Sequence, residues 1–324
     1  MKTPFVCNVA MCDHSVNVFS STDSFLPLFA GKGEYIPFIP GWECSTRKIK
    51  TPYSLYYYHR KGNSNLIYSP NKKSVRVYGD MRYFSDGQTL AYLIFSLLEL
   101  ERQKHYETTA HLASCSRNGK GIILLGERGA GKTSLLLALC KDYGYKLIAN
   151  DIAVIGFDKK LNHAYVRDGT KIFGLRHAVA KMHHPDLLKF FPKDVVDSWT
   201  TKSFILPREI GVQVENKKIS ISKIFFCHLY ANRNKRFFSK KMTGSWIKVN
   251  LYENFSRYVR GSSIIPFLDG SGGSNIGFIP PLDKNNFHKQ RVKFINYLVD
   301  DLGITYVSSG NLHEICEFIN KNLF

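Results

Sequence analysis

Acidic residues are scarce in this chain of 324 residues, in which 26 Asp and Glu side chains stand against 45 Lys and Arg. The formal charge of +19 means that the chain as a whole attracts polyanions. It favours the binding of nucleotides, nucleic acids or other acidic partners. The densest basic segment, residues 232–241, also contains aromatic residues. Such a pattern can bind single-stranded nucleic acid. It can equally form a hairpin whose aromatic side chains point inward.

The sequence also lacks long apolar runs and paired cysteines. No apolar run reaches the roughly 18 residues of a membrane-spanning helix, and residues 1–16 contain no continuous apolar stretch of the kind that a secretory signal has. The seven cysteines are scattered, without C-x-x-C spacing, so neither a zinc site nor a disulfide framework is indicated. Cys7, Cys12 and His14 could form part of a metal cluster, but unconnected thiols are the simpler interpretation. We therefore expect a cytoplasmic protein without a membrane partner.

A glycine-rich segment carries the strongest functional signal. It fits the pattern G-x-x-x-x-G-K-[ST], the phosphate-binding loop of nucleotide triphosphatases and kinases. A buried strand is predicted at 121–125, before the segment, and a helix over 132–142. Glycines let backbone N–H groups approach a phosphate, and the helix N-terminus adds its positive dipole end. The predicted nucleotide-binding residues are Gly126, Glu127, Arg128, Gly129, Ala130, Gly131, Lys132, Thr133 and Ser134.

Two residues of this segment have assigned chemistry in such loops. Lys132 would reach the β- and γ-phosphates of ATP, and the Thr133 hydroxyl would be a ligand of Mg²⁺. With glycine near 7% of residues, the pattern should occur by chance in roughly one chain in a hundred of this length. A glycine-rich turn with a surface lysine is therefore the weaker alternative.

An acidic residue follows the loop at an unusually short distance. The predicted helix ends at Tyr143-Gly144, a strand follows at 146–149, and Asp151 comes only 18 residues after Thr133. A carboxylate at a strand end beside a phosphate loop can hold Mg²⁺ or take a proton from an attacking hydroxyl. Acids at strand ends are also common turn formers, so Asp151 gains its meaning from the neighbouring loop.

The chain divides into two parts of different character. Residues 1–105 are predicted to form a small β-rich domain, with strands at 54–58, 65–68 and 74–78 and an apolar helix over 89–102. Residues 106–324 alternate strands and helices, which indicates an α/β fold with a central sheet. A flexible loop or lid is expected at 269–275, which is rich in glycine and serine. Beyond the loop region, strands are predicted at 152–157, 203–206, 219–229 and 304–307, and helices near 251–258, 285–300 and 311–323.

Residues 111–157 resemble HPr kinase/phosphorylase and its related kinases. The resemblance lies in His111-Leu-Ala-Ser followed by GKGIILLGERGAGKTSLLLALCKDYGYKLIANDIAVIG, and it extends more thinly over 106–324. It implies a phosphate-loop kinase core, shared with phosphoenolpyruvate carboxykinase, that transfers a phosphoryl group from ATP to a hydroxyl. Lys132 and Thr133 then correspond to the phosphate and Mg²⁺ ligands. Asp151 corresponds to the second acid of an Asp-Asp pair, as metal ligand or base, and His111 to the histidine before the loop strand.

The chain departs from this family at two places. Asn150 replaces the first acid of the pair, and the family's Glu-x-x-Gly-Leu-Gly signature has no convincing copy. HPr is therefore not the expected substrate, and the resemblance is better to relatives that phosphorylate serine-like metabolites or peptides. We predict an ATP- and Mg²⁺-dependent kinase, a self-associating one, that acts on an alcohol of a small molecule or peptide with an anionic character. The alternatives are a nucleic-acid-associated NTPase or RNA-directed kinase and a nucleotide sensor without turnover.

Overall fold

The computed structural model describes residues 4–12, 14–22, 42–62, 65–69, 73–80, 88–158, 160–257, 259 and 283–323. It divides the chain into two compact units. The first contains Met1–Thr109 and Glu253–Arg291, and the second contains Ala110–Tyr252 and Val292–Phe324. The chain thus leaves the second unit once and returns to it, whereas the sequence suggested a single boundary at 105/106. The expected loop at 269–275 lies outside the described residues.

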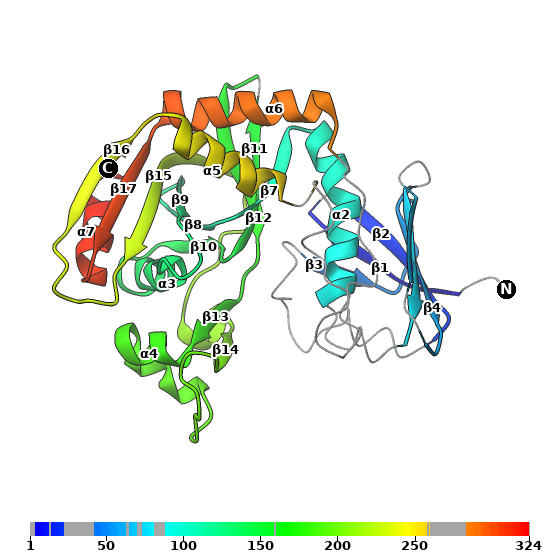
Figure 1. Ribbon diagram of the computed structural model, residues 1–324, viewed down its shortest axis with the longest axis horizontal. Helices are drawn as coiled ribbons and strands as arrows, with labels where there is room; N and C mark the ends of the chain where they lie inside the picture. Colours follow the sequence, from blue (N-terminus) through cyan, green and yellow to red (C-terminus); the bar gives the residue numbers. More distant parts are fainter. Residues whose placement is uncertain are drawn as a thin grey trace. The chain divides into compact units, whose positions relative to one another are not determined.

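The first unit is built on a six-stranded mixed sheet of order β3-β1-β2-β4-β6-β5 (Figure 1). Strands β1 and β2 form an antiparallel hairpin, β2, β4 and β6 are parallel to one another, and β5 is antiparallel to β6. The predicted strands and the predicted apolar helix are confirmed in this unit. The elements are β1 (Phe5–Met11), β2 (His14–Ser20), β3 (Trp42–Ser45), β4 (Ser54–His59), β5 (Asn65–Ser69), β6 (Ser74–Gly79) and α2 (Gln88–Lys104).

Alternating β-branched and aromatic residues explain this sheet. On β4 and β6, every second side chain is buried, as in Leu55, Tyr57, Val75 and Val77. Helix α2 covers β1 and β2 with a stripe of buried leucines and isoleucine. One face of the sheet is therefore a core, and the helix closes it.

The second unit contains a nine-stranded mixed sheet of order β10-β8-β9-β15-β12-β11-β7, in which β17 also pairs with β15, and β16 pairs with β17. Strands β9, β15 and β17 are parallel, so their carboxyl ends lie at one edge of the sheet. Strand β7 contributes Ala110 and His111 to this unit. The strands are β7 (Glu107–His111), β8 (Ala113–Arg117), β9 (Lys120–Leu125), β10 (Lys146–Ala149), β11 (Ile152–Asp158), β12 (His163–Gly169), β15 (Ile219–Leu229), β16 (Phe238–Met242) and β17 (Ile304–Ser309).

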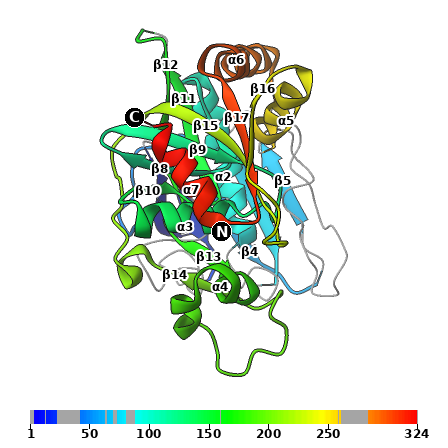
Figure 2. The same ribbon diagram turned by 90° about the vertical axis from the view of Figure 1, so that its left-hand side faces the viewer.

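Helices α3 and α7 lie side by side on one face of this sheet (Figures 1 and 2). The predicted helix over 132–142 is confirmed, and the predicted 251–258 helix begins earlier, at Ser245. The predicted 285–300 helix changes to a π-helical turn, η6, after Asn296. The helices of this part of the chain are α3 (Lys132–Asp142), α5 (Ser245–Ser256), α6 (Asn285–Asn296), η6 (Tyr297–Leu302) and α7 (Leu312–Lys321).

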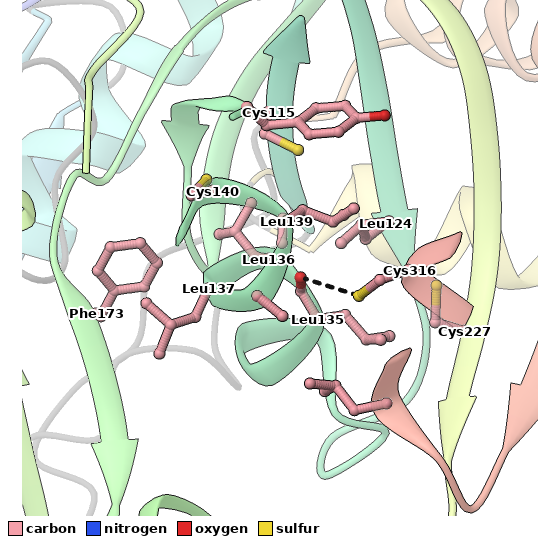
Figure 3. Close-up of a cluster of buried hydrophobic side chains, with 14 of the residues drawn as sticks. Cys115, Leu124, Leu135, Leu136, Leu137, Leu139, Cys140, Phe173, Cys227 and Cys316 are labelled. Atoms are coloured by element: carbon pink, nitrogen blue, oxygen red, sulfur yellow. Dashed lines mark hydrogen bonds between the residues drawn. The ribbon is translucent and has the colours of Figure 1, made fainter. Parts of the chain in front are cut away.

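The core of the second unit surrounds α3. Leu135 to Leu139 are all buried, so this helix is apolar on nearly every side (Figure 3). Four thiols share the same core, and the Sγ of Cys316 lies 3.9 Å from the carbonyl oxygen of Leu135. All seven cysteines of the chain are free thiols. Such a helix cannot stand alone in water, and its first turn is consequently held in place by the sheet and α7 together.

A small two-stranded sheet completes the second unit. It pairs β13 (Phe173–Arg176) with β14 (Lys202–Ile205), and the helices α4 (His177–His183), η4 (Pro185–Phe190) and η5 (Pro207–Ile210) lie along the chain beside it. The chain is thus a mixed α/β protein with several mixed sheets. Among the described residues, no helix is long and apolar enough to cross a membrane.

Candidate functional site

The loop of residues 126–131, here called the glycine loop, joins β9 to α3. Gly126, Gly129 and Gly131 have φ angles of 147°, 85° and 85°, values that residues with a Cβ rarely adopt. Packing adds a second constraint. A Cβ on Gly126 would lie 2.6 Å from the carbonyl oxygen of Cys227, and one on Gly131 would lie 2.6 Å from the Cβ of Leu229. The motif glycines are therefore required both by the loop conformation and by contact with β15.

The neighbouring strand and the first helical turn fix the shape of the glycine loop. The N–H of Leu229 donates to the carbonyl oxygen of Ala130 at 3.0 Å, and the N–H of Leu135 donates to that of Gly131 at 3.0 Å. No side chain among the described residues caps the N-terminus of α3. Free N–H groups at a helix N-terminus attract anions. The arrangement leaves these donors available to a phosphate.

Lys132 folds back over the glycine loop. Its Nζ donates to the carbonyl oxygens of Gly126 at 2.8 Å and Glu127 at 3.0 Å, and only 8% of the residue is exposed. Burial lowers the pKa of Lys132 from its usual value, and the negative charge of Asp151 opposes that shift. The ammonium group is therefore held at the mouth of the loop. Glu127, Arg128 and Gly129 are exposed around it.

Thr133 and Asn150 form a second contact behind the loop. The Thr133 hydroxyl donates to the Asn150 Oδ1 at 3.0 Å, and the Asn150 Nδ2 donates to the carbonyl oxygen of Ile172 at 2.8 Å. The first residue of the Asn-Asp pair is thus the one that contacts the threonine. Ser134 lies inside the helix, where its carbonyl oxygen accepts a hydrogen bond from the Nε2 of buried His184 at 3.2 Å.

Asp151 occupies the turn between β10 and β11 and contacts His111. Its Oδ1 lies 2.7 Å from the His111 Nε2, and about half of its side chain is exposed. The backbone of Asp151 has a φ of 86°, which is uncommon for a residue with a side chain. The N–H of Leu112 holds the Asp151 carbonyl oxygen at 3.1 Å. The surrounding structure therefore imposes a strained conformation that points the carboxylate outward.

Tight packing explains how this turn is held. Gly169, at the end of β12, lies so close to Ala149 that a Cβ on the glycine would be 2.1 Å from the Cβ of that alanine. Thr170 continues the contact, since its N–H donates to the Ile152 carbonyl oxygen at 2.9 Å and its carbonyl oxygen accepts from the Asn150 N–H at 2.8 Å. The last residue of β12 and the residue that follows it thus contact both sides of the Asn-Asp turn.

The electrostatic surroundings keep Asp151 ionised. Burial raises its pKa, but the hydrogen bond from His111 and the charges of His111, Lys202 and Lys132 together lower it below the usual value. His111 and Lys132, which the sequence singled out, therefore both favour the ionised form of Asp151. Lys202 was not anticipated from the sequence.

Lys202, on the β13–β14 hairpin, is a further positive charge that lowers the pKa of Asp151. Its Nζ lies 4.9 Å from the ring centre of Phe204 and passes so close to Gly174 that a Cβ there would be 2.7 Å away. Gly174 follows Ile172, whose carbonyl oxygen holds Asn150. A lysine 51 positions after Asp151 carries no local motif. The pairing of β13 with β14 is what brings it near.

The oxygen donors of this site suit a hard cation. The Thr133 hydroxyl, the Asn150 amide oxygen and the Asp151 carboxylate are the ligand types that Mg²⁺ accepts, and such sites take their remaining ligands from water and phosphate oxygens. No group of three His, Cys, Asp or Glu side chains in the described part of the chain could hold a metal ion alone. A cation here would accordingly depend on a bound phosphate.

Comparison with known proteins adds no relative on which to base a function. No protein-family model matches the chain, and a search of the curated proteins finds no match.

Proposed function

We propose that this chain is an ATP- and Mg²⁺-dependent kinase that transfers the γ-phosphate to a hydroxyl of a small molecule or peptide. The observation that carries the proposal is the hydrogen bond from Thr133 to Asn150, which joins the first turn of α3, where Lys132 folds over the glycine loop, to the turn of the Asp151–His111 pair. The loop supplies N–H donors, the lysine a positive charge, and the aspartate a negative charge that is held outward. A turn with only a structural role would not need to combine free N–H donors, a lysine and an accessible carboxylate.

Each group has a distinct part in phosphoryl transfer. The N–H groups of the glycine loop and Lys132 would stabilise the negative charge on the transferring phosphoryl group. Thr133, with Asn150 behind it, would bind Mg²⁺. Asp151 would orient the attacking hydroxyl and accept its proton, or bind Mg²⁺ directly. His111 would hold the carboxylate in position, and an alcohol would approach from the exposed side of Asp151.

The resemblance to HPr kinase/phosphorylase supports the same proposal. The order strand, glycine loop, helix, strand and acidic turn is the order expected from that phosphate-loop kinase core, and His111 lies where the resemblance assigns a histidine. The replacement of the first acid by Asn150 removes one carboxylate. Asp151 is then left as the single acid of the pair for metal binding and proton transfer.

A nucleic-acid-associated NTPase or RNA-directed kinase is the second candidate. The observation that favours it is a segment, residues 216–252, that contains nine Lys and Arg residues and no Asp or Glu. A small substrate does not require so long a basic segment. The basic surface could nonetheless serve an anionic peptide substrate of the first candidate.

The direct test is transfer of γ-labelled phosphate from ATP, screened against hydroxylated metabolites, serine-containing peptides and RNA. Lys132→Ala should reduce transfer at least a hundredfold, because it removes a charge from the transition state. Lys141→Ala is the matched control, since Lys141 lies in the same helix and pairs with Asp186 at 2.5 Å. Unchanged transfer in folded Lys132→Ala would contradict the proposal. Nucleotide binding by the wild type without any transfer would indicate a sensor instead.

A further inference from the structure

One face of the second unit's sheet carries a cluster of aromatic side chains in which Phe226 is buried and Phe238 and Trp246 are exposed. Alternation along β15 sends Cys227 toward the α3 core and Phe226 to the opposite face. There, the ring of Phe226 lies 6.3 Å from that of Tyr306 and 5.6 Å from that of Trp246, and Phe238 lies 6.1 Å from Tyr306. Trp246 is 54% exposed and Phe238 51% exposed. These four residues are called the aromatic face below.

Basic residues border the aromatic face. Lys240 of β16 is the register partner of Tyr306, and Lys235 lies over the ring of Tyr230 at 5.9 Å. Lys248 pairs with Asp300 at 2.6 Å. These three lysines are called the basic border below. Within the chain segment that builds most of this surface, residues 216–252, no carboxylate side chain occurs. The basic residues of that segment are Lys217, Lys218, Lys223, Arg233, Lys235, Arg236, Lys240, Lys241 and Lys248.

The aromatic face begins at the same sheet edge as the glycine loop. Strands β9, β15 and β17 are parallel, so the loops that follow β9 and β15 emerge together (Figure 2). Leu229 contacts Ala130 of the glycine loop, and the next residue, Tyr230, donates its N–H to the Ser309 carbonyl oxygen at 2.9 Å. The N–H of Gly310 in turn donates to the Lys235 carbonyl oxygen at 2.8 Å. A ligand on the basic border could therefore extend toward the glycine loop.

We propose that the aromatic face and its basic border bind single-stranded nucleic acid. Unpaired bases can stack on exposed aromatic rings, and the neighbouring lysines can neutralise the phosphates between them. A duplex keeps its bases stacked on each other and cannot use the rings. An acidic peptide could use the cations, but it brings no series of flat groups for Phe238 and Trp246. The inference does not depend on the proposed kinase activity.

Fluorescence anisotropy of a labelled 12-nucleotide oligo(U) and an oligo(dT) of equal length tests binding at several salt concentrations. The logarithm of the association constant should fall with the logarithm of salt concentration, with a slope of about −0.7 for each phosphate contacted. A duplex of equal length and a 12-residue poly-glutamate peptide are the comparison ligands. Tighter binding of the single strands supports the inference. Equal binding of the duplex, or preferential binding of the peptide, would overturn it.

Matched variants separate stacking from general charge. Trp246→Ala should weaken single-strand binding about tenfold, within the range measured for stacking on one aromatic residue. Trp199→Ala is the control, because Trp199 is also 54% exposed but lies outside the aromatic face. Trp246→Phe keeps a ring and should restore most of the binding if the fold is intact. Equal effects of Trp246→Ala and Trp199→Ala would contradict the inference.

The charge contribution has its own pair of variants. Lys240→Gln should reduce the magnitude of the salt slope by about 0.7, the contribution of one phosphate contact, whereas Lys193→Gln, at an exposed position before β14, should leave it unchanged. Equal slopes for both variants would count against a role of the basic border. Lys132→Ala should keep single-strand binding within twofold of the wild type. Loss of phosphate transfer and loss of nucleic-acid binding can therefore be told apart.

Discussion

Two polar clusters in this chain use similar groups in opposite surroundings. In the first unit, Glu99 and Arg102 have fully buried side chains 3.5 Å apart, and Thr109 donates to Glu99 through both its N–H and its hydroxyl. In the second unit, the Asp151–His111 pair is partly exposed, and its aspartate has a strained backbone. In the first cluster, the Glu99 carboxylate is fully engaged by Arg102, Thr108 and Thr109. The second leaves a carboxylate accessible to a ligand, which is the feature expected of a functional site.

The difference is also visible in what each cluster connects. Glu99 ties helix α2 to strand β7 through Thr108, whose hydroxyl also donates to the carbonyl oxygen of Phe255 at 3.1 Å. Helix α2 and strand β7 therefore meet at the Glu99 carboxylate, and Thr108 links both to the segment of Phe255. Asp151, by contrast, is held through its backbone, and its side chain has room to change partner. Substitutions should affect stability at the first cluster and turnover at the second.

Glu99→Ala is expected to have the largest effect on stability. Removal of one partner from a buried ion pair typically costs about 3–5 kcal/mol, because the remaining charge stays buried. Urea unfolding followed by circular dichroism measures the loss. Glu317→Ala is the control, since Glu317 forms an exposed pair with Lys321 at 3.8 Å and should cost at most about 1 kcal/mol. Similar losses for the two variants would remove the distinction between buried and exposed clusters.

His184 should make the stability of the second unit depend on pH. Burial, followed by the nearby charges of Lys141 and His183, lowers the pKa of His184 from 6.5 to about 4. Its neutral form is therefore favoured in the folded state, and this contribution is complete above pH 6.5. As the pH falls from 6.5 to 4, His184 becomes protonated in the unfolded chain but stays neutral in the folded one. About 3 kcal/mol of stability is therefore lost.

The measurement is urea unfolding between pH 4 and 8 for the wild type and His184→Gln. Glutamine can donate to the Ser134 carbonyl oxygen but does not titrate, so the variant should lose less stability on acidification than the wild type. Because Ser134 lies in the first turn of α3, the effect concerns the helix that carries Lys132. Parallel pH profiles for the two proteins would show that His184 does not control this dependence.

Asp151→Asn should lower kcat about a hundredfold or more, the lower range for loss of a general base, with little change in stability. Asn150→Ala should lower stability more than kcat. It removes the contacts of a buried amide to Thr133 and Ile172, which typically costs about 1–3 kcal/mol of stability. Phosphate transfer from γ-labelled ATP and urea unfolding are measured for both variants. Equal losses of kcat would show that the roles within the Asn-Asp pair are assigned wrongly.

Local sequence patterns predicted the parts of the site that depend on local structure. The glycine pattern predicted the position of the loop. The apolar run after it predicted helix α3 with its observed limits. The glycines also pack against β15, which is about a hundred residues further along the chain. That contact depends on the parallel pairing of β9 and β15, and no local pattern reports it.

The contacts that the sequence did not predict all cross between elements. The Thr133 hydroxyl donates to the Asn150 Oδ1 at 3.0 Å, a contact that the sequence did not indicate. A metal ion shared by Thr133 and Asp151 stays a prediction. Lys202 enters the site only through the β13–β14 hairpin. The aromatic residues at 237 and 238 were ambiguous between an inward and an outward arrangement. Phe237 packs against the core and Phe238 is exposed, so both alternatives apply, one to each residue.

The smallest predicted effect concerns the backbone of Asp151. At a φ of 86°, glycine avoids the steric cost of a Cβ, so Asp151→Gly should raise the free energy of unfolding by about 0.5–1 kcal/mol while it abolishes phosphate transfer. Asn118→Gly is the control. Asn118 has a φ of 51° in the exposed turn between β8 and β9, where asparagine is well tolerated, and the change should be only a few tenths of a kcal/mol. Urea unfolding of both variants gives the two values. If Asp151 is a functional residue in a strained turn, its replacement by glycine should raise the free energy of unfolding and lower turnover. If Asp151→Gly instead destabilised the protein as strongly as Glu99→Ala, Asp151 would be a structural residue like Glu99, and the contrast between the two clusters would fail.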